Sequence, residues 1–225
     1  MQFSMTRMIR EGMADGDIGV VAARAGVGKS ACLVQIAMAE LLDGKAVLHV
    51  SLENKVSHVR QWYSNLITKI EGESKLPPHE LKLQVEQNRH IHSYLDDGFT
   101  AERLADSHQF IREHMELDPK LVVIDGFPFE KATKEQLQSL AMTAKELKLQ
   151  IWFSALTHRH LPAADENGLP FPLESFADQL DQVVHFDPES DGIGVRIWRR
   201  DRTEWTQLPI KLDPKTMLLI PPKEA

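Results

Sequence analysis

Several features that other proteins depend on are scarce or absent in this chain of 225 residues. Cys32 is the one cysteine, so no internal disulfide can form and the core must be held together by packing, as in a reducing compartment. Lys and Arg total 26 against 33 Asp and Glu; the formal net charge of −7 excludes binding of nucleic acid by bulk positive charge, although not by a local basic groove. No apolar run approaches about 18 residues, and residues 1–10 lack the apolar segment of a signal peptide. We therefore expect a soluble cytoplasmic protein without a membrane span.

Apolar strand-like runs alternate with helix-like segments along most of the chain. Strands are predicted over residues 17–23, 46–51, 90–94, 121–125 and 150–156, and helices over 29–42, 55–70, 100–117 and 134–147. From residue 183 onward the pattern changes to short strands separated by Asp, Gly and Pro. This order predicts an α/β fold with a mostly parallel central sheet flanked by helices and with antiparallel C-terminal strands, in a single domain over 1–225. Two long loops are expected, over 71–82 and 161–173.

The strongest motif is a glycine-rich segment between a strand and a helix, residues 23–30, which reads ARAGVGKS. Glycines allow consecutive backbone N–H groups to point at an anion, and the start of the helix adds partial positive charge. Lys29 would reach the β- and γ-phosphates of a nucleotide, and the Ser30 hydroxyl would bind the Mg²⁺ that bridges them. The alternative is a chance Gly-Lys-Ser in a turn, and the usual motif begins with Gly where this chain has Ala23. The predicted nucleotide-binding residues are Ala25, Gly26, Val27, Gly28, Lys29, Ser30 and Ala31.

Two carboxylates follow predicted strands. Asp125 comes directly after four apolar residues, where the aspartate of phosphate-loop enzymes holds Mg²⁺ through water. Glu53 ends the strand before it, in the sequence Ser-Leu-Glu, where a carboxylate can orient and deprotonate a water that attacks the γ-phosphate. Taken alone, Glu53 is equally well explained as a solvated residue at the end of a strand.

Residues 20–31 (VVAARAGVGKSA), 50–53 (VSLE) and 124–125 (ID) together resemble the RecA-like ATPase core. They are most similar to the branch that holds the DnaB-type replicative helicases and the KaiC-like ATPases. The helicase branch also often begins its phosphate loop with Ala-Ala-Arg, as this chain does. The resemblance covers residues 11–219 and implies that Glu53 is the catalytic glutamate and that ATP and Mg²⁺ are bound.

The resemblance also implies a role for basic residues late in the chain. RecA-like rings often carry a Lys-x-Arg pair on a late strand, which reaches the γ-phosphate of the neighbouring subunit. Arg200 and Arg202 fit that pattern with Arg in place of Lys. Alternating on a strand, their side chains would share one face, with Arg199 opposite. The alternative is a solvated basic strand edge. Residues 212–216 resemble the turn that closes such domains, and no chemistry is assigned to them.

Three departures from the helicases limit what the resemblance implies. The helicase strand that matches residues 151–156 carries a Gln that senses the γ-phosphate, whereas here Ser154, Thr157 or His158 would have to do so. The loop over 158–172, where RecA-like proteins carry a mobile substrate loop, has mixed charge rather than the basic character of a DNA clamp. The helicase N-terminal domain does not occur in these residues. DNA-coupled motor activity is therefore not expected on this basis. Three other aromatic residues, Trp152, Trp198 and Trp205, are interpreted as packing residues.

The sequence therefore predicts a Mg²⁺-dependent RecA-like ATPase that forms a homo-oligomer, either a ring or a filament, with an unidentified client. Two alternatives stay open. One is a nucleotide-dependent switch or assembly module that does not hydrolyse ATP, and the other is an accessory DNA replication or recombination ATPase.

Overall fold

The structure is a computed structural model, and it describes residues 2–70, 72, 76–95, 98–158, 168–190 and 192–221, with the side chains of 2–4 and 203 excepted. A nine-stranded sheet forms its centre, in the order β3-β2-β4-β5-β1-β6-β7-β8-β9. The strands are β1 Ile18–Ala23, β2 Val47–Ser51, β3 Arg89–Ser93, β4 Leu121–Asp125, β5 Gln150–Leu156, β6 Gln182–Glu189, β7 Gly192–Arg199, β8 Arg202–Leu212 and β9 Leu219–Ile220. The helices are α1 Gln2–Arg10, α2 Lys29–Leu42, α3 Val56–Ile70, α4 Pro78–Asn88, α5 Ala101–Met115 and α6 Lys134–Leu147, with a 3₁₀ helix, η1, at Leu173–Gln179.

The sheet changes from parallel to antiparallel pairing at β6, as the sequence predicts. Strands β3, β2, β4, β5, β1 and β6 pair in parallel, and β7, β8 and β9 continue the sheet by antiparallel pairing. Strands β1, β2 and β4 are buried along their whole length, because helices cover both faces of the parallel part and leave no side of these strands for polar residues. The predicted fold class is confirmed.

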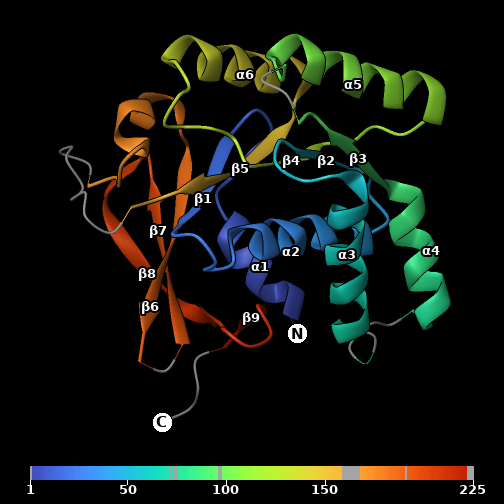
Figure 1. Cartoon of the computed structure of the whole chain (residues 1–225), viewed down its shortest axis with the longest axis horizontal. Helices are drawn as coiled ribbons and strands as arrows, with labels where there is room; N and C mark the ends of the chain where they lie inside the picture. The colour runs from blue at the N-terminus through green and yellow to red at the C-terminus, as the bar shows by residue number, and fades with distance from the viewer. Residues whose placement is uncertain are drawn as a thin grey trace.

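Helices cover the two faces of the sheet unequally (Figure 1). Helices α1, α2, α3 and α4 lie on one face, and α5, α6 and η1 lie on the other. Each face has its own cluster of buried apolar side chains, so the parallel strands lie between two cores. Among the described helices, none is long and apolar enough to span a membrane.

Capping residues account for the predicted starts of two helices. The Thr100 hydroxyl accepts a hydrogen bond from the Arg103 backbone N–H at the start of α5. At the start of α6, Thr133 and Gln136 form a reciprocal capping box. Helix α2 differs, because its N-terminal cap is Gly28 and no side chain caps its first turn. The free backbone N–H groups of a helix start are a site for an anion.

Two elements are not anticipated by the sequence analysis. Helix α1 packs Met5 and Ile9 into the core against α2, and Arg10 joins it to Glu40 and donates a 2.7 Å hydrogen bond to Gln150 Oε1. The 3₁₀ helix η1 buries Leu173 and Phe176 at the end of the predicted loop over 161–173. Much of that loop lies outside the described residues, as do residues 71 and 73–75 of the other predicted loop, whose last part is the start of α4.

The region around Arg200 and Arg202 corrects the sequence prediction. Arg199 pairs with Arg202 across the β7–β8 hairpin, so Arg200 and Asp201 form its turn and do not continue a strand. The argument from alternation along a strand therefore does not apply, because the chain reverses between the two residues. Arg199 is on the other side, as expected, where its guanidinium donates to Gln182 Oε1 and to the Glu11 carbonyl.

Candidate functional site

The phosphate loop, residues 23–30, leaves the carboxyl end of β1 and enters α2. Gly26 and Gly28 have φ values of 75° and 108°, which side chains disfavour, so glycine is required for this path. The Lys29 side chain folds back over the loop, where its Nζ donates to the Arg24 carbonyl at 3.2 Å. Burial lowers the pKa of Lys29 below its usual value, and the nearby carboxylates of Asp125 and Glu53 act against that shift. The loop thus presents backbone N–H groups and a lysine to one small space.

Ser30 and Asp125 meet at the bottom of this space. The Ser30 hydroxyl donates to Asp125 Oδ1 at 3.1 Å, although the two residues are 95 positions apart. Asp125 is 2% exposed, and its Oδ2 has no hydrogen-bond partner in the described part of the chain. A buried carboxylate oxygen without a partner is costly unless a cation or water occupies the site. Hard oxygen donors of this kind suit Mg²⁺, which uses one or two carboxylates together with phosphate oxygens.

The described residues do not form a metal site by themselves. No group of three or more His, Cys, Asp or Glu side chains within the described ranges is placed to hold a metal ion. The Ser30 and Asp125 oxygens therefore fit Mg²⁺ only as part of a site that phosphate oxygens complete.

Glu53 lies at the same edge of the sheet, in the turn that follows β2. The Leu52 backbone N–H donates to the Asp125 carbonyl at 2.9 Å, and the Asn54 N–H donates to Ser51 Oγ at 3.0 Å. The exposed Glu53 side chain lies against Gly126, where an added Cβ would be 2.5 Å from Glu53 Cγ. Parallel strands β2 and β4 end side by side, which brings the two predicted carboxylates to one edge.

The three candidate phosphate sensors after β5 differ in their surroundings. Ser154 is 3% exposed and its Oγ accepts a 2.8 Å hydrogen bond from the Gly126 N–H, so it fixes the turn beside Glu53. The Thr157 backbone N–H donates to the Ala23 carbonyl, which places Thr157 at the first residue of the phosphate loop. His158 is exposed and its Nε2 is 2.6 Å from Glu130 Oε1. Of the three, Thr157 is attached directly to the phosphate loop.

Arg200 and Arg202 lie at the opposite edge of the sheet from the phosphate loop. Arg199 pairs with Gln182, which pairs with Gly19, four residues or roughly 13 Å before the end of β1. Arg200 donates to the Leu180 carbonyl and its guanidinium is 3.1 Å from Asp181 Oδ1, whereas Arg202 is exposed. The structure therefore does not bring this pair to the loop of its own chain.

Some residues of the site give no signal in the sequence analysis. Gly126 contacts Glu53, and Trp62 of α3 lines a cavity beside the phosphate loop together with residues 216–218. The positive φ of 84° at Gly126 has a sequence signal, a glycine directly after the strand-ending aspartate. Trp62 has only its position on the helix that follows Ser51-Leu52-Glu53.

This fold and this loop, with its lysine, serine and strand-end aspartate, define a P-loop nucleotide-binding protein of the RecA-like class. The chain belongs to the AAA domain family, whose model matches residues 4–140. Its structure is similar to the solved ATPase domain of a DnaB-like helicase, with a TM-score of 0.69 and 14% sequence identity over 98% of this chain and 89% of that one. At this identity the likeness concerns the fold, and it confirms the predicted resemblance to the RecA-like ATPases near the DnaB-type helicases. No curated protein matches the chain by sequence.

Proposed function

We propose that this protein binds Mg·ATP at the phosphate loop and hydrolyses it. The observation that carries the proposal is the meeting of Lys29, Ser30, Asp125 and Glu53 at one edge of the sheet, from three separate elements. The match to an AAA domain family and the likeness to an ATPase domain support it.

Each residue has a role that its surroundings support. The N–H groups of the loop hold the phosphates, and Lys29 stabilises the charge that develops on the γ-phosphoryl group. Ser30 and Asp125 hold Mg²⁺, which neutralises the β- and γ-phosphate oxygens when it is bound. Glu53 orients the attacking water and accepts its proton, because it is the exposed carboxylate beside the buried metal-binding pair. Bound phosphates favour the charged form of Lys29, which opposes the effect of its burial.

A second copy of the chain is proposed to complete the site. Arg202, and with it Arg200, would reach the γ-phosphate held by a neighbouring copy, since neither reaches the loop of its own chain. This places catalysis at the junction between copies and makes turnover depend on protein concentration.

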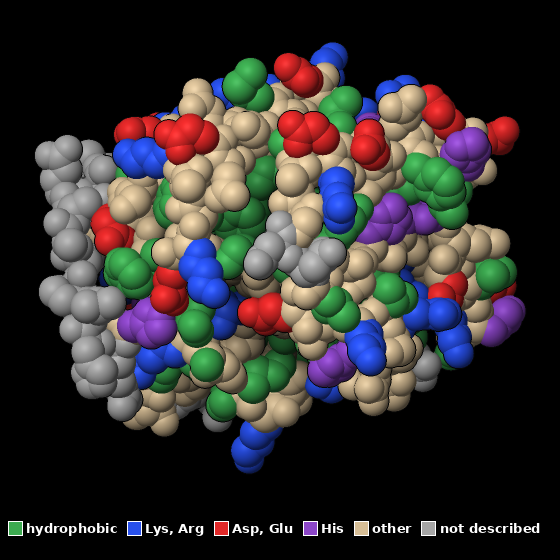
Figure 2. Space-filling model, turned by 45° about the horizontal axis from the view of Figure 1, so that its top comes forward, with side chains coloured by type: hydrophobic (Ala, Val, Ile, Leu, Met, Phe, Trp, Pro, Cys, Tyr) green, Lys and Arg blue, Asp and Glu red, His purple; other side chains and the backbone are tan. Residues whose placement is uncertain are grey.

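The described surface gives little support to a DNA-dependent role. Figure 2 shows Lys and Arg side chains scattered among acidic ones on the visible face of the described residues, without a continuous basic band. Binding of DNA by electrostatics requires such a band or groove. Accessory DNA activity therefore remains an outcome of the test.

The test is the ATPase rate measured against protein concentration, with and without single-stranded DNA. We expect a slow rate that rises more steeply than linearly with concentration and does not respond to DNA. A rate that rises with DNA would favour the replication or recombination ATPase, and binding without turnover at every concentration would favour the nucleotide-dependent switch.

Two variants identify the site. Lys29→Ala is expected to lose ATP binding or to lower turnover by orders of magnitude while the fold survives, with exposed Lys82→Ala on α4 as the matched control. Glu53→Gln is expected to keep Mg·ATP affinity within a few-fold and to lose turnover, because it removes an interaction made in the transition state. The control for Glu53→Gln is Glu113→Gln on the exposed face of α5. Wild-type turnover in Lys29→Ala would remove the assignment of the loop, and wild-type turnover in Glu53→Gln would transfer the role of base to another group.

A further inference from the structure

A cavity of about 350 Å³ opens directly beside the phosphate loop and takes no part in the steps above. One wall is the first two turns of α2, from Lys29 to Gln35. The facing wall is α3, and the third is the 216–218 turn between β8 and β9. Its volume lies within the roughly 300–1,000 Å³ that is typical of small-ligand sites. Its position means that a ligand whose phosphates occupied the loop would extend into it.

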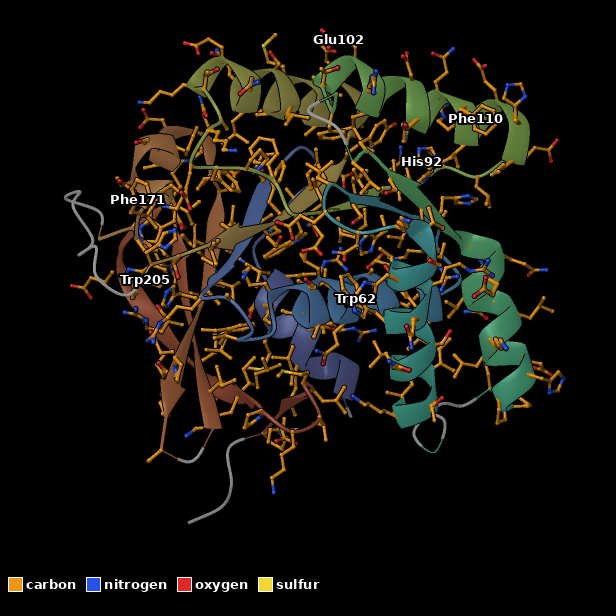
Figure 3. The ribbon with its side chains drawn as sticks, viewed as in Figure 1. Trp62, His92, Glu102, Phe110, Phe171 and Trp205 are labelled. Carbon is orange, nitrogen blue, oxygen red and sulfur yellow. The ribbon has the colours of Figure 1, made fainter. Side chains whose placement is uncertain are left out.

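The lining of this cavity is apolar and contains one aromatic ring. Val34 and Leu66 are buried in its walls, and Met217 packs against the same core cluster from the turn. Trp62 is half-buried and lies between α2 and α3 (Figure 3). The exposed Asn65 lies on α3 at the rim and supplies a polar group with both a donor and an acceptor. A flat, heteroaromatic ligand with apolar faces and a polar edge matches this lining.

The third wall is fixed to both helices by hydrogen bonds. Gln35 of α2 donates from Nε2 to the Met217 carbonyl at 2.9 Å and accepts from the Leu219 N–H at 2.9 Å. Lys69 of α3 donates from Nζ to the Thr216 carbonyl at 2.7 Å. Gln35 is 2% exposed, so its two hydrogen bonds are a buried and specific link. The turn is thus held at a set distance from the cavity's other walls.

The turn is also packed onto the phosphate loop itself. A Cβ added at Gly28 would lie 2.5 Å from Leu212 Cδ2 and 3.3 Å from Met217 Sδ. The conformation of the loop and the position of the turn therefore depend on each other. Residues 212–216, to which the sequence assigns no chemistry, form the approach to this wall.

We propose that the cavity is the binding site for the nucleobase of the nucleotide, a purine, with the Trp62 ring stacked on one face of the base and Met217 against the other. The proposal rests on the proposed function, because the phosphates in the loop direct the base into the cavity. Asn65 at the rim meets the polar edge of the base.

The test compares ATP with inorganic tripolyphosphate, which has the phosphates but no base, in the presence of Mg²⁺. Dissociation constants are measured for the wild type, Trp62→Ala and Trp62→Phe. We expect Trp62→Ala to weaken ATP binding about 5- to 150-fold, the usual range for loss of a base-stacking aromatic residue, and to leave tripolyphosphate binding unchanged. Trp62→Phe should retain ATP affinity within a few-fold, since it keeps an aromatic face. The matched control is Trp205→Ala, whose ring packs on Arg196 of β7 instead.

Tryptophan fluorescence gives a second measurement that needs no variant with altered binding. ATP should change the emission of wild type and of Trp205→Ala, whereas tripolyphosphate should not, and Trp62→Phe should lose the change. Equal ATP affinity in wild type and Trp62→Ala would overturn the base site while Lys29-dependent ATP binding left the proposed function intact. Equal losses for ATP and tripolyphosphate would also overturn it, because they would indicate a disturbed loop. A wild-type protein that binds neither ligand would overturn both proposals.

Discussion

Replacement of Gly126 by alanine tests whether Glu53 must lie where the structure places it. Gly126 follows Asp125 at the end of β4, and its φ of 84° is in the left-handed region. An alanine Cβ there would lie 2.5 Å from Cγ and 2.8 Å from Cδ of Glu53. The Glu53 side chain is exposed and flexible, so it would move aside instead of forcing the backbone to shift.

The size of the effect follows from these distances. Glu53 must move by about 1 Å to regain an ordinary contact of 3.4 Å, and a misplacement of about 1 Å costs on the order of 10²-fold in rate. The positive φ adds a separate cost of about 1–2 kcal/mol to folding for any residue with a Cβ. Ground-state binding of Mg·ATP depends on the loop, Ser30 and Asp125, so its dissociation constant should change by less than a few-fold.

Gly44→Ala separates the two effects. Gly44 has a similar φ of 73°, but the nearest atom to its added Cβ is Gln84 Nε2 at 4.0 Å, in a turn away from the site. Both variants should therefore lose similar stability in urea unfolding, and Gly126→Ala alone should lose turnover in steady-state kinetics. Equal turnover in the two variants would refute the argument that Gly126 exists to make room for Glu53.

Two further outcomes are expected. Arg202→Ala or Arg200→Ala should lose turnover and keep nucleotide affinity, by up to the roughly 10³–10⁵-fold typical of arginine fingers, and mixing either variant with Lys29→Ala should restore part of the ATPase rate; mixtures that stay inactive would exclude a shared site. Burial lowers the pKa of His49 from 6.5 to about 3, so the unfolded chain binds more protons between these values and the free energy of unfolding should fall by about 1.4 kcal/mol per unit as pH drops from 6.5 towards 3. His49→Gln should flatten that slope in urea titrations at several pH values, and an unchanged slope would assign it to other groups.

Where a local pattern decides an element, the sequence predicts it closely. Predicted bounds for α2, β4, α6 and β5 match the structure, because uninterrupted apolar runs and helical spacing are signals within the segment itself. Helix α1 has such a signal, apolar Met5 and Ile9 at a spacing of four, but only docking against α2 buries it. The prediction at Arg200 is wrong because a chain reversal between two basic residues has no apolar pattern.

The candidate site divides along the same line. The Ser30 hydrogen bond to Asp125 follows from the rule that parallel strands end at one edge, so motifs at strand ends meet. The contact of Gly126 with Glu53 and the place of Trp62 opposite Met217 depend on which side chains of distant segments face each other. Spacing along the chain contains no information about that.

The two ends of the sheet set a condition on any shared site. The phosphate loop and the turns after β2, β4 and β5 gather at the carboxyl edge, whereas Arg200 and Arg202 lie at the amino edge of β1 and β6. Both sets can act on one phosphate only if the amino edge of one copy faces the carboxyl edge of another, which is a head-to-tail contact when repeated. Arg200 is already held by Asp181 and the Leu180 carbonyl, so its use would first break that pair, while the exposed Arg202 is available at no such cost. Arg202 is therefore the residue of the two whose loss should reduce turnover more, and Arg200 the one whose loss should also disturb the β7–β8 hairpin.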